Sequence, residues 1–262
     1  MYKLGFIGVG NMAGAIAKGA AKAGYFKGVE VMAFDVNVAA TRSLEEEYGI
    51  KRAPSAVQLA KECDIILLGV KPDVIKLVID EIYGELSSKA VVSIALGWNK
   101  ERLDEALPTG TRVQNVMPNT PCLVGSGMTL FCADTSLVAD ELAFVKGLFE
   151  SVGAVETLNA KVMGPAGTLT GCGPAFVYMF IEALCDGAVY HGVPRELSYK
   201  LASQMVMGSA QMVMESKMHP GALKDSVCSP GGSTIRGVDA LEKGAFRATV
   251  MNAIHGPESY GK

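Results

Sequence analysis

The stretch Leu4-Gly5-Phe6-Ile7-Gly8-Val9-Gly10-Asn11-Met12-Ala13-Gly14 decides the fold of this chain. Its apolar first part, Leu4 to Val9, predicts a short buried strand, and Met12 to Ala23 predicts a helix that Gly24 ends. A glycine turn that leads from a buried strand straight into a helix is typical of the first unit of an α/β domain. We therefore expect the N-terminal part of the chain to form a sheet covered by helices.

The turn within this stretch has the pattern G-x-G-x-x-A, the arrangement that binds the pyrophosphate of a dinucleotide. Gly8 permits the tight turn, and Gly10 lets the backbone approach the phosphates. Ala13 and the following Gly14 allow the helix to pack closely on the strand, while the first N–H groups of the helix meet the phosphate charge. The candidate cofactor-binding residues of this turn are Gly8, Val9, Gly10, Asn11, Met12 and Ala13.

An acidic residue at the end of the next strand supports a nicotinamide cofactor. Asp35 closes the predicted strand Val29 to Phe34, at about 20 residues beyond the turn, where ribose recognition expects an acid. Its carboxylate would accept a hydrogen bond from the ribose 2′-hydroxyl and repel a 2′-phosphate, which favours NADH. Asn37, Thr41 and Arg42 follow, and they would meet the phosphate of NADPH if Asp35 turned away. NADPH and NADH therefore both stay open.

Short β-branched runs alternate with amphipathic stretches throughout residues 1–158. Because such alternation implies right-handed crossovers, it predicts an α/β N-terminal Rossmann domain with a doubly wound, mostly parallel sheet. Ser55 is predicted to cap one of its helices. Further strands are predicted at 65–70, 90–96 and 112–117, with 128–132 and 155–158 extending the sheet, and helices at 39–48, 55–63, 72–83, 100–107 and 138–151.

Two loops at the carboxyl edge of this sheet carry further candidates, because ligands of doubly wound sheets bind at that edge. Val70, Lys71 and Pro72 follow a central strand, which places them near the nicotinamide end of the crevice. Lys71 is a catalytic candidate, although an ordinary lysine at the end of a strand would look the same. In the loop Met117 to Pro121, two prolines fix the backbone and leave the amide of Asn119 as a rigid hydrogen-bonding group.

Residues 159–262 are predicted to form a second, all-helical domain, since apolar residues recur at helical spacing from Gly173 to His255. Methionine suits irregular apolar contacts, so a methionine stripe here indicates either core packing or a helix–helix dimer seam. We favour a homodimer, because about 100 residues of such apolar helices bury themselves poorly alone. The longest helix is predicted at about 194–217, and the methionines of the stripe are Met205, Met207, Met212, Met214 and Met218.

A second glycine-rich loop, Ser229 to Thr234, precedes the predicted helix Ile235 to Lys243. A glycine pair with hydroxyl residues at the start of a helix exposes several N–H groups, and such a nest holds a carboxylate or a phosphate. The alternative is a plain loop whose Ser or Thr caps the helix. The candidate substrate-binding residues are Ser229, Gly231, Gly232, Ser233 and Thr234.

Charge and composition exclude several classes of protein. The chain has 24 Lys and Arg against 27 Asp and Glu, a net charge of −3 that argues against a nucleic-acid partner. The uncharged runs Val113 to Ala133 and Val162 to Ile181 contain prolines and glycines, which would leave backbone unpaired in lipid. We therefore expect a soluble protein with no membrane partner. Met1 to Lys3 leads directly into an apolar strand, which predicts no export signal and a cytoplasmic location.

The cysteines and histidines indicate no site of their own. No C-x-x-C pair occurs, so we expect buried, reduced thiols and no metal. The histidines lie at helix ends or breaks and are interpreted as structural or surface residues. They are His191, His219 and His255, and the cysteines are Cys63, Cys122, Cys132, Cys172, Cys185 and Cys228.

Several stretches match one known family, the most specific being a C-terminal signature that fits position by position. That signature comprises Pro220-x-x-Leu223, Val227-Cys228-Ser229-Pro230-Gly231-Gly232-Ser233-Thr234, Gly237-Val238 and Leu241-Glu242. The stretches Phe6 to Met12, Val70 to Pro72, Met117 to Pro121 and Gly171 to Ala175 are also typical of it. Over nearly its whole length the chain therefore resembles the pyrroline-5-carboxylate reductase family. It departs from the family at three positions. This chain has Asn115 where an arginine is usual, Gly164 where an aspartate is usual, and Cys172 where a serine is usual.

The resemblance implies an N-terminal Rossmann domain and an all-α C-terminal dimerisation domain that interlocks two subunits, and rings of dimers occur in the family. It implies reduction of 1-pyrroline-5-carboxylate to L-proline, the final step of proline biosynthesis, by hydride transfer from NADPH or NADH. The nest would hold the substrate carboxylate. The Thr234 hydroxyl would hydrogen-bond near the ring nitrogen, which makes Thr234 a catalytic candidate beside Lys71.

This reaction agrees with the absence of a strong acid motif. A cyclic imine protonates readily, so catalysis rests on positioning and on exclusion of water. The alternatives are a reductase of a related cyclic imine, a hydroxy-acid dehydrogenase with Lys200 as its nearest candidate, and a nucleotide-binding regulatory paralogue without turnover. Binding of the cofactor with no turnover of any cyclic imine would favour the regulatory paralogue.

Overall fold

The computed structural model describes residues 3–28 and 30–258. Outside these ranges lie Met1 and Tyr2, on which the export-signal prediction partly rests. Val29, the predicted start of the second strand, also lies outside them. The chain divides into two compact units, of which the first ends at Gly171 and the second begins at Cys172.

The first unit contains an eight-stranded sheet with the order β3-β2-β1-β4-β5-β6-β7-β8. Neighbouring strands are parallel except β6 and β7. The predicted doubly wound Rossmann class is confirmed, together with the two strands that extend the sheet, whereas β3 is too short to have left a pattern. The strands are β1 (Lys3–Ile7), β2 (Glu30–Phe34), β3 (Lys51–Arg52), β4 (Ile65–Leu68), β5 (Ala90–Ser93), β6 (Arg112–Met117), β7 (Gly127–Cys132) and β8 (Gly153–Leu158).

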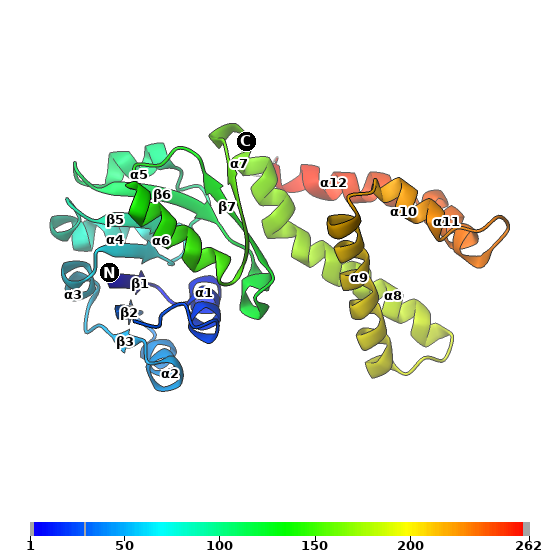
Figure 1. The fold of residues 1–262 in the computed structure, drawn as a ribbon, viewed down its shortest axis with the longest axis horizontal. Coiled ribbons are helices and arrows are strands. Elements are labelled where there is room, and N and C mark those ends of the chain that lie inside the picture. Colours follow the sequence, from blue (N-terminus) through cyan, green and yellow to red (C-terminus); the bar gives the residue numbers. More distant parts are fainter. Residues whose placement is uncertain (1–2, 29, 259–262) are drawn as a thin grey trace. The chain divides into compact units, whose positions relative to one another are not determined.

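Helices cover both faces of this sheet (Figure 1). On one face α1, α2 and α6 pack around a buried cluster that includes Phe6, Phe131 and Phe149. On the other face α3, α4 and α5 pack around Ile66 and Trp98. The helices are α1 (Asn11–Lys22), α2 (Val38–Tyr48), α3 (Ala56–Glu62), α4 (Ile75–Ile82), α5 (Lys100–Ala106) and α6 (Ala139–Glu150), with short 3₁₀ turns at η1 (Tyr83–Glu85) and η2 (Thr120–Val124).

Local signals fix where several helices begin and end. Ser55 caps α3 as predicted, since its hydroxyl accepts a hydrogen bond from Gln58 N at 3.1 Å. Asn37 and Asn99 cap α2 and α5 through their side-chain oxygens. Helix α2 ends at Gly49, whose φ of 68° is left-handed backbone that glycine adopts without strain.

A continuous run of helix extends from Ala160 to Tyr190. It consists of α7 (Ala160–Gly167), the π-helical turn η3 (Thr168–Cys172) and α8 (Gly173–Tyr190). We expected the prolines and glycines here to leave backbone unpaired in lipid, yet the stretch is helical, with Pro165 inside α7 and Pro174 near the start of α8. The carbonyl of Thr170, four residues before Pro174, accepts a hydrogen bond from Asn119 Nδ2 instead. By length and composition the run is apolar enough to cross a membrane, and 6% of its most apolar window is buried. One such helix is weak evidence, because core helices of globular proteins have the same composition.

The first unit extends beyond residue 158, where we predicted the domain boundary. Helix α7 packs against β7, with Met163 buried beside Leu130 and Cys132. A Cβ on Gly167 would lie 2.5 Å from the sulfur of Met117, so the helix approaches the end of β6 closely. These contacts place residues 159–171 with the sheet rather than with the helices that follow.

The second unit is helical throughout its described residues, as predicted. Besides α8 it contains α9 (Arg195–Ser216), α10 (Pro220–Ser226), α11 (Ser233–Lys243) and α12 (Phe246–Glu258). Among the side chains described in this unit, Cys185, Ser198 and Ala202 alone are buried. The five methionines of the stripe are 45–76% exposed. Packing of the stripe into a core of the second unit itself is therefore excluded.

Candidate active site

The turn after β1 has the geometry that a phosphate-binding backbone needs. Gly8 has a φ of 84°, and a Cβ at this position would lie 2.5 Å from Cγ1 of Val70 and 2.8 Å from its backbone nitrogen. Gly10, the N-cap of α1, differs because a Cβ there would meet nothing within 4 Å. Gly8 is thus required by the tight turn, whereas Gly10 leaves open space at the start of the helix.

The start of α1 is open to an anion. The first hydrogen bond of the helix runs from Gly14 N to Gly10 O at 2.8 Å, so the N–H groups of residues 11–13 precede it. Gly10 provides no side-chain cap, and no acidic residue lies in the first turn. Helix and strand ends also pack closely, because a Cβ on Gly69 would lie 2.4 Å from the Cβ of the buried Ala13.

Asp35 is directed back onto this turn. Its Oδ2 accepts a hydrogen bond from Val9 N at 2.7 Å, and its Oδ1 accepts one from Asn37 N at 2.8 Å. The carboxylate therefore joins the end of β2 to the central residue of the glycine turn. Each oxygen keeps a further lone pair, so recognition of the ribose stays a prediction for Asp35.

One of the residues considered for the NADPH phosphate has to be withdrawn. Thr41 is 4% exposed, and its hydroxyl donates to Val38 O at 3.0 Å within α2. This hydroxyl is buried and occupied, so it is not available to a phosphate. The side chain of Asn37 caps α2, while Arg42 is exposed on the same helix. Arg42 therefore remains as the cationic candidate.

The loop after β4 lies against the glycine turn at one end and is exposed at the other. Val70 is half-buried beside Gly8, as the distances above require. Lys71 is exposed, and within the described part of the chain its ammonium has no hydrogen bond or ion pair. The carbonyl of Pro72 accepts a hydrogen bond from Nε1 of Trp98 at 2.8 Å. The Lys71 side chain is thus free to reach a ligand, and its part in catalysis stays a prediction.

Asn119 proves to be a bridge between backbone segments. Its Oδ1 accepts from Met128 N at 2.8 Å, and its Nδ2 donates to Thr170 O at 3.0 Å. The side chain is 7% exposed and joins the loop after β6 to β7 and to the turn η3. One amide hydrogen of Nδ2 and one lone pair of Oδ1 remain, so the predicted contact with the cofactor is restricted to these.

The second glycine-rich loop forms a turn that opens onto a helix. Gly232 N donates to Ser229 O at 3.0 Å, and Gly231 has the φ of 70° that the residue after proline needs in such a turn. Gly232 is the N-cap of α11, with no side-chain cap. Ser233 and Thr234 are exposed, and among the described residues neither hydroxyl has a hydrogen-bond partner. The capping alternative is therefore excluded, and the start of α11 is open to an anion.

The histidines and cysteines mostly occupy the roles expected of them. Nδ1 of His219 accepts from Gly221 N at 3.0 Å and caps α10. Burial raises the pKa of the Cys63 thiol to about 12. All six thiols are free, but Cys172 and Cys228 are partly exposed, which corrects the expectation of six buried thiols. In the described ranges no three His, Cys, Asp or Glu residues group as metal ligands would.

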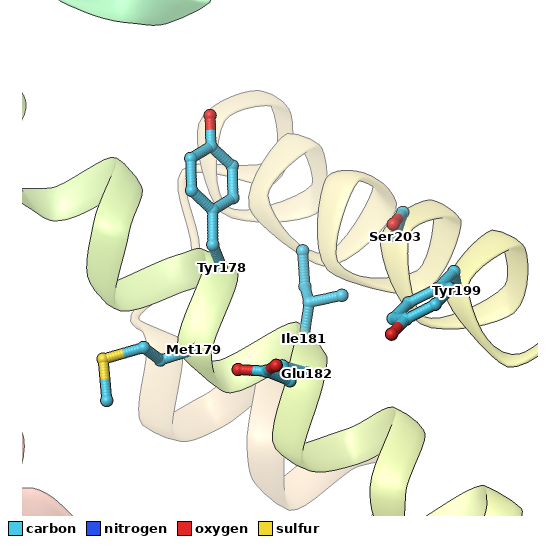
Figure 2. A pocket seen from close by; sticks show the side chains of 6 residues that line it. All are labelled: Tyr178, Met179, Ile181, Glu182, Tyr199 and Ser203. Carbon is cyan, nitrogen blue, oxygen red and sulfur yellow. The ribbon is translucent and has the colours of Figure 1, made fainter. Parts of the chain in front are cut away.

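A hollow of about 410 Å³ lies between α8 and α9 of the second unit. Figure 2 shows its lining side chains, and both Tyr178 and Met179 are more than half exposed. The hollow thus belongs to the exposed apolar surface of the second unit. Its lining residues are Tyr178, Met179, Ile181 and Glu182 from α8, and Tyr199 and Ser203 from α9.

Comparisons with known proteins agree over both units. Residues 160–258 match a family described as pyrroline-5-carboxylate reductase dimerisation, and residues 3–97 match one described as NADP oxidoreductase coenzyme F420-dependent. The chain is 41% identical to pyrroline-5-carboxylate reductase of Escherichia coli K12, over 96% of this chain and 94% of that protein. It is 40% identical to the Arabidopsis thaliana enzyme of the same name, over 97% and 92%. The crystal structure of Plasmodium falciparum pyrroline carboxylate reductase with NADP bound matches with a TM-score of 0.88 and 37% identity, over 98% of this chain and 95% of that one.

Proposed function

Because the chain belongs to the pyrroline-5-carboxylate reductase family, we propose that its two glycine-rich loops hold a reduced nicotinamide dinucleotide and the carboxylate of a cyclic imine. The protein is an NAD(P)H-dependent oxidoreductase that reduces 1-pyrroline-5-carboxylate to L-proline. The observation that carries the assignment of the sites is that both loops expose unpaired N–H groups at the start of a helix.

The dinucleotide belongs at the turn after β1. The N–H groups of Asn11, Met12 and Ala13 face the pyrophosphate, and Gly10 leaves the space that the phosphates need. Asp35 then lies beside the adenosine ribose, and Val70 to Pro72 lie towards the nicotinamide end. NADP in the Plasmodium relative supports NADPH, the carboxylate of Asp35 supports NADH, and we assign the site to either cofactor. When bound, the reduced nicotinamide supplies the hydride.

The substrate belongs at the start of α11. The N–H groups that follow Gly232 bind its carboxylate, with Ser229 and Ser233 beside them, and the Thr234 hydroxyl lies near the ring nitrogen. Hydride adds to the carbon of the C=N bond, the π electrons of that bond become a lone pair on nitrogen, and a proton completes the amine. Because the imine nitrogen is basic, the substrate carries this proton itself, and Thr234 orients the ring. Lys71 would offset the charge of the bound dinucleotide.

The second unit is proposed to dimerise through its helices. A unit in which three described side chains are buried exposes its apolar faces to water, and association of two copies would cover them. The match of residues 160–258 to a dimerisation family supports the same partner. Rings of such dimers and a cytoplasmic location are further expectations from the resemblance.

The decisive experiment measures oxidation of NADPH and NADH, in parallel, by purified protein supplied with racemic pyrroline-5-carboxylate, with proline as the analysed product. Thr234→Ala should raise KM for the imine and leave KM for the dinucleotide unchanged. Nucleotide binding without turnover of any cyclic imine would indicate a regulatory paralogue. Turnover confined to a six-membered imine would indicate a related reductase.

The dimer is tested by sedimentation of Met214→Glu, which places a charge in the exposed stripe. We expect this variant to be monomeric. Leu77→Glu is the matched control, because Leu77 is an exposed apolar residue on α4 of the first unit, 69% accessible against 76% for Met214. A dimeric Met214→Glu protein would exclude the stripe from the interface.

A further inference from the structure

Two hydrogen bonds join three neighbouring strand ends at the carboxyl edge of the sheet. Asn115, near the end of β6, donates from Nδ2 to Trp98 O at 2.9 Å. Trp98, in the loop after β5, donates from Nε1 to Pro72 O at 2.8 Å. Because β4, β5 and β6 are adjacent in the sheet, the bonds form one chain from β6 to the loop after β4.

The contacts of Trp98 fix its side chain, so that its hydrogen bond can hold Pro72 in place. It is 2% exposed and packs in the buried cluster on one face of the sheet. The guanidinium of Arg102 lies 4.2 Å from the centroid of its ring, and Arg102 also donates to Gly97 O at 3.3 Å. Asn115 holds the carbonyl of Trp98 and Arg102 covers its ring, so the orientation of the indole N–H is fixed.

The loop Val70 to Pro72, at the end of this chain of bonds, packs tightly against the glycine turn after β1. Gly8 and Gly69 each lack room for a single added carbon, since a Cβ would lie 2.5 Å from Val70 in the first case and 2.4 Å from Ala13 in the second. A shift of a few tenths of an ångström in the loop after β4 therefore moves the turn, or is blocked by it. The position of the turn depends on the position of this loop.

We propose that Trp98 and Asn115 are positioning residues of the dinucleotide site. Their hydrogen bonds hold the loop Val70 to Pro72 in the place that fits a bound nicotinamide dinucleotide. Neither residue needs to touch the cofactor. The inference rests on the proposed assignment of the turn after β1 to the dinucleotide, and it gives a role to Asn115, a position where the family usually has an arginine.

The effect to expect follows from the two bonds. Without them the loop samples several positions, and the cofactor binds only the one that fits. The apparent dissociation constant then equals the intrinsic one divided by the fraction of molecules whose loop is in that position. Losing one buried neutral hydrogen bond corresponds to about a fivefold rise in the dissociation constant. Since neither side chain reaches the reacting atoms, kcat should change less than the dissociation constant.

The experiment compares Trp98→Phe, which keeps the ring and removes the donor, with Asn115→Leu and with the double variant. Dissociation constants for NADPH are read from the emission of the bound dihydronicotinamide, and thermal unfolding is recorded beside them. Both single variants should bind about fivefold more weakly. Both bonds hold the same loop through Trp98, so breaking either one releases it. The double variant should therefore bind NADPH no more weakly than the single variant with the lower affinity.

Thr111→Val is the matched control. The Thr111 hydroxyl, just before β6 at the opposite edge of the sheet, shares its one hydrogen between Pro108 O at 2.8 Å and Leu86 O at 3.0 Å. It should lower thermal stability to a similar degree and leave NADPH binding unchanged. The positioning role is wrong if Trp98→Phe and Asn115→Leu lower thermal stability but leave NADPH binding unchanged. It is also wrong if their effects on binding add in the double variant. The dissociation constant is measured without the imine, so failure of the proposed reaction would be seen separately, as bound NADPH that is not oxidised.

Discussion

Replacing Asp35 by asparagine separates two roles that the structure gives to one carboxylate. The first is structural, because Asp35 accepts hydrogen bonds from Val9 N at 2.7 Å and from Asn37 N at 2.8 Å. An asparagine of the same shape accepts one of them and turns an N–H₂ group towards the other N–H. A lost hydrogen bond to a charged group costs about 1.5–3 kcal/mol, and this loss weakens NADH and NADPH alike.

The second role is electrostatic and differs between the two cofactors. Unit charges about 4 Å apart interact by about 1 kcal/mol in water and about 4 kcal/mol at the effective dielectric constant of a protein surface. For the half-buried Asp35 we take about 2 kcal/mol as the repulsion removed from a 2′-phosphate, which corresponds to about 30-fold. The ratio of kcat/KM for NADPH to that for NADH should therefore rise about 30-fold in Asp35→Asn.

The assay is the rate of cofactor oxidation at limiting NADPH and limiting NADH, with the imine in excess. Asp64→Asn is the matched control, since Asp64 also accepts a backbone hydrogen bond, from Lys3 N at 2.9 Å, at the opposite end of β1. Its cofactor ratio should stay that of the unaltered protein. An unchanged ratio in Asp35→Asn would refute the reasoning, because it would mean that the carboxylate acts on the turn alone and not on the ribose.

Three further predictions follow from the glycines and one buried thiol. Gly69→Ala should lower the free energy of unfolding by about 1–3 kcal/mol, because its methyl group would lie 2.4 Å from Ala13; Gly84→Ala, with open space around it, should be neutral by the same urea titration. Gly231→Ala should raise KM for the imine while KM for NADPH stays constant, since alanine is strained at a φ of 70°; a change in both constants would contradict the assignment of the nest. Burial raises the pKa of Cys63 to about 12, so brief alkylation of the native protein at pH 8 followed by peptide mass analysis should leave Cys63 unmodified, and rapid labelling there would contradict its burial.

The features that the sequence predicts correctly are those encoded by neighbouring residues. The G-x-G-x-x-A turn places an open glycine at Gly10 and a constrained one at Gly8, as its spacing requires. Ser55 caps α3 because the donor it needs lies three residues ahead. Hydrophobic periodicity gives most strands and helices, since a buried face repeats every two residues in a strand and every three or four in a helix. Where an element is very short, as in Lys51–Arg52, no period exists to be read.

The features that sequence analysis misses are hydrogen bonds from side chains to distant backbone. Asp35 reaches Val9, Asn119 reaches Thr170, and Trp98 reaches Pro72. Every residue offers the same carbonyl, and every residue except proline the same N–H, so the identity of the partner leaves no trace in the sequence. The roles of Asn119 and Asp35 in joining segments could be found only once the segments were in place. Trp98 gave one weak signal, as the single tryptophan of the chain in a loop at the carboxyl edge.

The run from Ala160 to Tyr190 shows why counting glycines and prolines misleads. A proline interrupts a helix by removing one N–H and crowding the preceding turn. Pro174 is tolerated near the start of α8 because the carbonyl of Thr170, four residues before it, accepts a hydrogen bond from Asn119 Nδ2 at 3.0 Å. The π-helical turn η3 absorbs the change of register between α7 and α8. Tolerance thus depends on where each residue falls relative to the helix ends, and a composition count does not contain that information.

Apolar content predicts that a surface will be buried, but not what buries it. In the second unit the predicted helices form, and yet Met205, Met207 and Met214 remain about half to three-quarters exposed. A helix bundle that buried these residues itself would need more chain on the other side of them. Because the described helices do not supply it, the remaining way to remove this surface from water is association. The proposed second copy of the chain would cover this surface, and the sedimentation of Met214→Glu tests that proposal directly.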